Sequence, residues 1–161
     1  MSRQTSFGCR GVSCLVLLSV LLGHPAFTIG GEFRAGSYAV DISPRTLPAI
    51  QNGSFLEQTS DRIDDPLYAR CLVMSDADTT IGIAIVDSCM IPRDVCDAIK
   101  RLVERDCGIS ADRILIAATH THSAPSMMDH CLGSRIDVAY TEFAIPRIAS
   151  GIIRAHELME P

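Results

Sequence analysis

The sequence predicts an α/β fold with a mixed, partly parallel sheet and packed helices. Apolar runs that are typical of buried strands alternate along the chain with segments whose apolar residues recur at helical spacing. Two of these runs, 69–74 and 81–86, are joined by a polar turn, which favours an antiparallel hairpin. A helical segment then leads to a further apolar strand near Ile114, and this order favours a sheet that is at least partly parallel. A chain of 161 residues with 47% hydrophobic residues suits such a globular domain.

The first element is an expected export signal in residues 1–30. Two arginines precede the apolar stretch 12–22, which is short for a bilayer span but suits the apolar core of a signal peptide. Cleavage is expected between about Ala26 and Gly31, with an uncleaved membrane anchor as the alternative. We therefore expect residues 31–161 to form an exported chain, either periplasmic or extracellular.

The predicted strands follow the signal. Residues 37–42 are expected to form a short strand, and 43–66 a long polar loop with a turn at Asn52–Gly53. Residues 69–74 and 81–86 then form the hairpin. Long loops inside compact domains are often functional, so the segment 43–66 is a candidate for lining a site.

Helical spacing predicts two helical regions. The first begins after Pro92, a residue that the first helical turn tolerates, and ends at Gly108. The second runs from about Asp137 to Leu158, where Pro146 is expected to kink the helix or to begin a new one. Both are assigned to the core architecture rather than to function.

The strand near Ile114 delivers two histidines, His120 and His122, at its carboxyl end. Side chains on a strand alternate faces, so both imidazoles are expected to point the same way into one small volume. Open α/β sheets place their ligand sites at this end of the strands. Hydroxyls from Thr119 and Thr121 could orient the rings. The pair could therefore bind a metal, polarise a carbonyl or move a proton.

Residues 119–125, Thr-His-Thr-His-Ser-Ala-Pro, resemble the THTHSGP signature of the neutral/alkaline, non-lysosomal ceramidases, with alanine in place of glycine. Three further segments resemble family motifs in the same order: the opening strand and turn at 39–44, the DPLYAR segment at 65–70, and the linker 108–113. The resemblance covers roughly residues 36–158. It implies that the chain is similar to the amino-terminal portion of a larger catalytic domain.

The resemblance implies a zinc-dependent enzyme that hydrolyses an N-acyl amide bond, splitting ceramide or a related lipid amide, and hence a role in sphingolipid metabolism. It implies that His120 is a ligand of Zn²⁺. It also implies that His122 lies beside the metal as a catalytic group that helps to bind or polarise the amide, with a role as second ligand left open. A lipid substrate implies association with a membrane surface.

The resemblance also implies a shortfall of ligands. In this family a second histidine, a glutamate and a tyrosine farther along the chain complete the zinc site, and none of them has a counterpart before Pro161. Catalytic zinc normally needs three protein ligands. We therefore expect a truncated region of the catalytic domain that hydrolyses ceramide poorly or not at all by itself.

Two other classes of function stay open. One is a cysteine hydrolase that uses Cys89 or Cys131 with His122. The other is an inactive, truncated relic or a binding module of the same fold. Of 7 cysteines, two lie in the expected signal; the remaining odd number favours free core thiols. Nucleic acid is excluded as a partner, because the net charge is -5 and phosphate binding needs clustered Lys and Arg.

Several other polar residues are candidates for the site. Asp87, which follows the strand 81–86, and Asp41 could lie near a metal, against a simple capping role. Arg70 is expected to form a structural ion pair with Asp65. His130 is expected to be a solvated loop residue.

Overall fold

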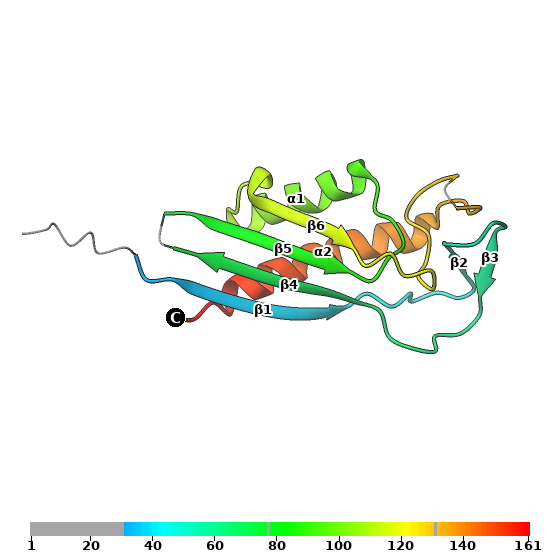
Figure 1. The fold of residues 1–161 in the computed structure, drawn as a ribbon, viewed down its shortest axis with the longest axis horizontal. Helices are drawn as coiled ribbons and strands as arrows, with labels where there is room; N and C mark the ends of the chain where they lie inside the picture. The colour runs from blue at the N-terminus through cyan, green and yellow to red at the C-terminus, as the bar shows by residue number, and fades with distance from the viewer. Residues whose placement is uncertain (1–30, 77, 131) are drawn as a thin grey trace, which may run out of the picture.

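The structure is a computed structural model that describes residues 31–76, 78–130 and 132–161. It consists of a four-stranded sheet with two long helices and a small two-stranded sheet at one end (Figure 1). The expected signal segment lies outside the described residues. Among the helices of the described residues, none is long and apolar enough to cross a membrane.

The main sheet contains β1 (Arg34–Asp41), β4 (Tyr68–Ser75), β5 (Thr80–Val86) and β6 (Ile114–Ala118) in the order β1-β4-β5-β6. β1 pairs with β4 and β4 with β5 in antiparallel register. β5 and β6 are parallel. The predicted α/β class, the hairpin and the partly parallel sheet are therefore confirmed.

The helices begin and end close to the predicted positions. α1 spans Arg93–Cys107, with Pro92 at its N-cap and Gly108 as a left-handed C-cap at φ 78°. α2 spans Val138–Glu157 as a single helix that contains Pro146. The alternative in which Pro146 begins a new helix is wrong, because α2 begins earlier, where the Asp137 side chain accepts the Tyr140 N–H.

The predicted loop 43–66 contains two short strands. β2 (Ala49–Gln51) and β3 (Gln58–Ser60) pair antiparallel on either side of the predicted turn at Asn52–Gly53. Strands of three residues are too short to show a period of two in the sequence. They form because long-range contacts hold them: Asp137 Oδ2 accepts the Ile50 N–H at 3.0 Å.

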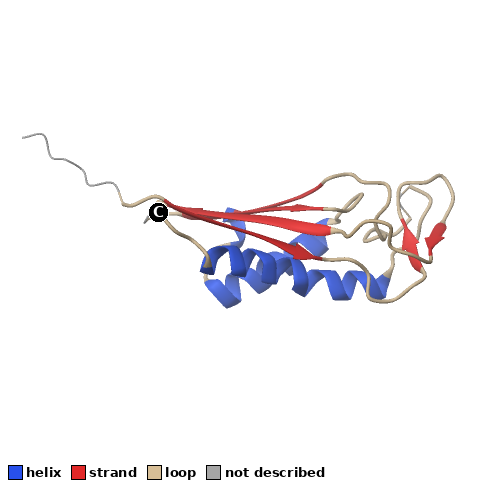
Figure 2. Cartoon of the chain, turned by 90° about the horizontal axis from the view of Figure 1, so that it is seen from below, coloured by secondary structure: helices blue, strands red, loops and turns tan. Residues whose placement is uncertain are grey.

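The two long helices cover one face of the main sheet (Figure 2). The short 3-10 helix η1 (Ala111–Arg113) directly precedes β6. The core lies between sheet and helices, where residues such as Val73, Val86, Ile99 and Ile152 are fully buried. The opposite face of the sheet carries apolar side chains that are partly exposed: Leu72, Ile81, Ile85 and Leu115. The site described below lies at the end of the sheet to which β5 and β6 point (Figure 1).

Candidate metal centre

The histidines lie beyond the last strand, in a turn. β6 ends at Ala118, and one further parallel hydrogen bond joins the Thr119 N–H to the Val86 carbonyl at 2.9 Å. The backbone then turns into the left-handed region at His120, with φ 62°. The prediction that both side chains share a strand face is therefore wrong, because residues 119–125 are not a strand. A left-handed residue other than glycine is uncommon, and such residues are enriched at functional sites.

The turn nevertheless brings the two imidazoles together. The Nε2 atoms of His120 and His122 are 3.3 Å apart. The ring centroids are separated by 4.8 Å, and the planes are nearly perpendicular at 86°. Both residues are exposed to solvent, so their facing nitrogens are accessible to a ligand.

A carbonyl group orients the ring of His120. Its Nδ1 lies 2.9 Å from the carbonyl oxygen of Cys89, in the segment between β5 and α1. Because a carbonyl oxygen only accepts, Nδ1 must carry the proton, and the lone pair of the neutral ring is then on Nε2. Metal-binding histidines almost always donate their other ring N–H in this way. His120 is thus oriented as an Nε2 ligand.

The donor set fits zinc. Ligand atoms of Cys89, His120 and His122 all lie within 4.8 Å of one another, and imidazole is a ligand that zinc prefers. The Cys89 thiol lies on the Nδ1 side of the His120 ring, so the two imidazoles are the candidate donors. Two imidazole nitrogens that bind one tetrahedral zinc at about 2.0–2.1 Å lie roughly 3.3 Å apart. The Nε2–Nε2 distance of 3.3 Å matches this value, so the geometry permits His122 either as a second ligand or as a group beside the metal.

The position of the Cys89 thiol does not match the cysteine-hydrolase alternative. Its thiol is 3.7 Å from Nδ1 of His120, whereas that alternative paired it with His122. Cys89 is only 2% exposed, which shields the sulfur from a substrate. Cys131, the other candidate nucleophile, lies outside the described residues.

The remaining described cysteines behave as structural thiols. Cys71, Cys96 and Cys107 form no disulfide within the described part of the chain. Burial raises the pKa of all three thiols, in Cys71 to about 12. Cys71 is therefore a core residue, as expected, whereas Cys96 and Cys107 are half-buried, and the raised pKa makes all three poor nucleophiles.

The small β2–β3 sheet packs against the histidine turn, a contact that sequence reasoning missed. The Gln51 side chain donates from Nε2 to the His122 carbonyl at 2.8 Å. The Asn52 N–H donates to the Ala124 carbonyl at 3.1 Å, and the Ser126 N–H to the Ile50 carbonyl at 2.8 Å. The Asn52–Gly53 dipeptide was the available signal, but it predicted only a turn.

Asp87 is committed to other partners. Its carboxylate accepts the Tyr68 N–H at 3.0 Å and two contacts from the Arg70 guanidinium at 2.9 and 3.0 Å. The predicted structural ion pair of Arg70 is confirmed, but its partner is Asp87 and not Asp65, because Asp87 directly follows β5, the strand that pairs with β4. The carboxylate orders the start of β4.

Asp41 and His130 also bond to residues other than His120 and His122. Asp41 Oδ1 accepts the Ser43 N–H at 2.7 Å, and this bond is the main reason that the pKa of Asp41 is lowered. His130 is an exposed loop residue beside Asp129, with 3.3 Å between the ring nitrogen and the carboxylate. Its expected place in a solvated loop is confirmed.

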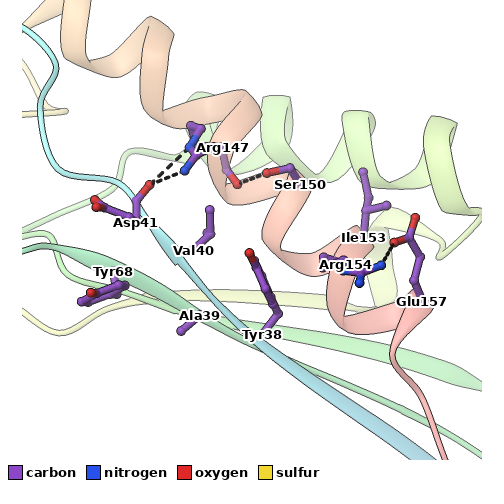
Figure 3. Close-up of a pocket in the computed structure, with 10 residues that line it drawn as sticks. All are labelled: Tyr38, Ala39, Val40, Asp41, Tyr68, Arg147, Ser150, Ile153, Arg154 and Glu157. Carbon is purple, nitrogen blue, oxygen red and sulfur yellow. Dashed lines mark hydrogen bonds and ion pairs between the residues drawn. The ribbon is translucent and has the colours of Figure 1, made fainter.

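Two hollows lie near the sheet. A cleft of about 420 Å³ adjoins the histidine turn and is lined by Thr121 and Ser123 together with Leu47 and Ile63 from the long loop. A more open groove of about 490 Å³ runs between β1 and α2 (Figure 3). In that groove the Arg147 guanidinium donates to the Asp41 carbonyl and joins α2 to β1, whereas Arg154 pairs with Glu157 at 2.7 Å within α2.

Solved structures share this fold. The chain is similar to neutral ceramidase from Pseudomonas aeruginosa, with a TM-score of 0.70 and 24% identity over 80% of this chain and 22% of that one. A ceramidase complexed with C2 matches over the same shares, with a TM-score of 0.67 and 24% identity. No family model and no curated protein matches the sequence. The predicted resemblance to part of a ceramidase is confirmed at the level of the fold, and the chain spans 22% of the length of these solved chains.

Proposed function

We propose that this chain supplies part of the active site of a zinc-dependent amidohydrolase that cleaves N-acyl lipid amides of the ceramide class. The observation that carries the proposal is the histidine pair: His120 is oriented by the Cys89 carbonyl, and its Nε2 faces that of His122 at 3.3 Å. The shared fold with neutral ceramidase supports the choice of reaction and substrate.

His120 is the proposed zinc ligand. Its backbone turn and the Cys89 carbonyl direct Nε2 away from the segment that follows β5. A zinc ion held by His120 would supply an acidified water as the nucleophile and would polarise the amide carbonyl. The chain must provide an imidazole with a fixed tautomer, and the Nδ1–H to carbonyl bond leaves Nε2 as the nitrogen available to a metal.

His122 is the proposed catalytic group. Among the described residues no carbonyl or carboxylate accepts a hydrogen bond from its Nδ1, so it lacks the second contact that a ligating histidine usually makes. Its exposed ring can donate a proton to a departing amine or stabilise charge on the amide oxygen. A role as second ligand is the alternative, and zinc titration of His122→Ala distinguishes the two roles.

The cleft beside the turn is the proposed entry of the substrate. Leu47 and Ile63 are partly exposed there at 38% and 44%, and Thr121 and Ser123 add hydroxyls next to the histidines. Arg62, Asp64 and Asp65 also line the cleft, so its walls are mixed, and its apolar part is the proposed contact for an acyl chain. The exposed apolar side chains are consistent with action on lipid at a membrane surface, and the expected signal in residues 1–30 with an exported protein.

The proposal is tested on two levels. Zinc content and hydrolysis of a fluorescent short-chain ceramide are measured for the 161-residue chain, with and without added zinc, a chelator or a thiol reagent. We expect weak zinc binding with little or no turnover, because catalytic zinc normally has three protein ligands and His120 is the one proposed ligand in this chain. A chimera in which this chain replaces its counterpart in neutral ceramidase should then show chelator-sensitive hydrolysis that depends on both His120 and His122.

The alternatives give different results. A cysteine hydrolase would be inactivated by thiol reagents and indifferent to chelators. A relic or binding module would bind ceramide without retaining zinc, and its chimera would stay inactive while folding normally. Retention of full chimeric activity after loss of both histidines would overturn the proposal.

A further inference from the structure

We propose that the tip of the β2–β3 hairpin, residues 51–54, is a positioning element for His122, and that Gly53 and Gln51 are its positioning residues. This tip contacts the histidine turn, residues 119–125. The consequence for catalysis rests on the proposed function, but the placement of the ring is tested without zinc or substrate.

The steric contact at Gly53 carries the inference. Gly53 has a φ of 105°, and a Cβ built on it would lie 2.5 Å from both Cβ and Cγ of His122 and 2.8 Å from its Cα. Contacts this short are not tolerated, so any side chain would have to displace His122 or the hairpin. The backbone of the tip is therefore in direct contact with the start of the imidazole side chain and limits where the ring can go.

Hydrogen bonds also join the hairpin tip to the histidine turn. Gln51 Nε2 donates to the His122 carbonyl at 2.8 Å, across 71 positions of the sequence. The Asn52 side chain is buried and donates from Nδ2 to Ser126 Oγ at 3.1 Å. The tip thus grips the turn on both sides of His122, so the backbone of His122 cannot shift without breaking these bonds.

The hairpin is itself anchored to the helix layer. Asp137, the N-cap of α2, accepts the Ile50 N–H, and Ser134 donates from Oγ to the Gln51 carbonyl at 2.5 Å. Arg135 binds Glu57 through two contacts of 2.6 and 2.9 Å. The position of the tip is therefore set by the rest of the fold rather than by the histidine turn alone.

The two imidazoles are held by different elements. His120 is oriented by the Cys89 carbonyl, which lies between β5 and α1, whereas His122 is held by the tip. The 3.3 Å between their Nε2 atoms therefore depends on two independent supports. A change in the tip should move the ring of His122 and leave that of His120 in place.

The test compares Gly53→Ala with Gly108→Ala in the 161-residue chain without metal. Gly108 has a similar left-handed φ of 78°, but a Cβ there meets nothing within 4 Å, so it controls for backbone strain. Long-range proton–nitrogen NMR spectra report the tautomer and environment of each imidazole. We expect Gly53→Ala to shift the ring nitrogens of His122 more than those of His120, His130 or His156, and Gly108→Ala to shift none.

A second pair of variants keeps the test valid if Gly53→Ala fails to fold. Gln51→Ala removes the hydrogen bond to the His122 carbonyl, and Gln58→Ala removes the exposed glutamine that pairs with it across the hairpin. Only Gln51→Ala should shift or broaden the His122 signals. Unchanged His122 signals in folded Gly53→Ala and Gln51→Ala, or equal shifts in the two glutamine variants, would overturn the inference, whatever the chain does with zinc.

Discussion

Nδ1 of His120 donates a hydrogen bond to the carbonyl oxygen of Cys89 across 2.9 Å. This bond joins the turn after β6 to the segment after the parallel neighbour β5, and it decides which ring nitrogen is available for a metal. Cys89 therefore orients the His120 ring through its backbone carbonyl.

Replacing His120 with asparagine should weaken zinc or cobalt binding by more than about tenfold, because the change removes the oriented Nε2. Asparagine tolerates the left-handed backbone that His120 adopts, so the fold should be retained. The matched control is His130→Asn, another exposed histidine with positive φ, at 51°. Calorimetric titration of the metal is the measurement, and equal losses in the two variants would remove His120 from the ligand set.

His122→Ala should leave zinc affinity largely intact while lowering turnover of the ceramidase chimera by roughly a hundredfold, the scale of one proton-transfer group or oxyanion donor. The reason is that the His122 ring is placed by the hairpin tip beside the metal site rather than by the contact expected of a ligand. Zinc titration and steady-state kinetics are compared with His130→Ala. A loss of zinc as large as that of the His120 variant would make His122 a second ligand.

Cys89→Ala should retain metal affinity within experimental error, because the contact that orients His120 is made by the backbone carbonyl. The thiol lies on the Nδ1 side of the ring, at 3.7 Å. Cobalt spectra of the unmodified chain should accordingly lack a thiolate-to-cobalt charge-transfer band. The appearance of that band, and its disappearance in Cys89→Ala, would show that the sulfur is a ligand.

The ion pair between Glu57 and Arg135 should make the stability of the hairpin depend on pH. Hydrogen bonds from the Arg135 side chain and backbone lower the pKa of Glu57 to about 2. Because the folded pKa is below the unfolded value of about 4.3, the pair stabilises the fold above that value, and the contribution is lost as the pH falls toward 2. Wild type should therefore be slightly more stable than Glu57→Gln at pH 7 and equal to it near pH 2.

Unfolding curves of both proteins across this pH range are the measurement for the ion pair. The effect should be small because both side chains remain accessible to solvent, at 30% and 68%. Glu142→Gln, at an exposed position on α2, is the control for removal of a negative charge. A difference between wild type and Glu57→Gln that is the same at pH 2 and pH 7 would show that the ion pair does not contribute in this way.

Local patterns in the sequence were sufficient for most of the main sheet and the helices. The apolar runs at β4, β5 and β6 mark strands, because strands inside a sheet carry nearly continuous apolar residues. Gly108 marks the end of α1 because its left-handed backbone suits glycine. The chemistry of the site was also visible, since two histidines at the end of an apolar strand are a local feature.

The tertiary structure alone decided how that chemistry is arranged. The left-handed turn at His120, its bond to the Cys89 carbonyl, the contact of Gly53 with His122 and the pairing of Arg70 with Asp87 all join residues that are brought together by folding. Residue types and spacing encode local backbone preferences and the period of burial. They do not encode which distant backbone group faces a side chain, because that follows from how strands and loops pack in three dimensions, and so the partners of His120 and His122 emerged only from the fold.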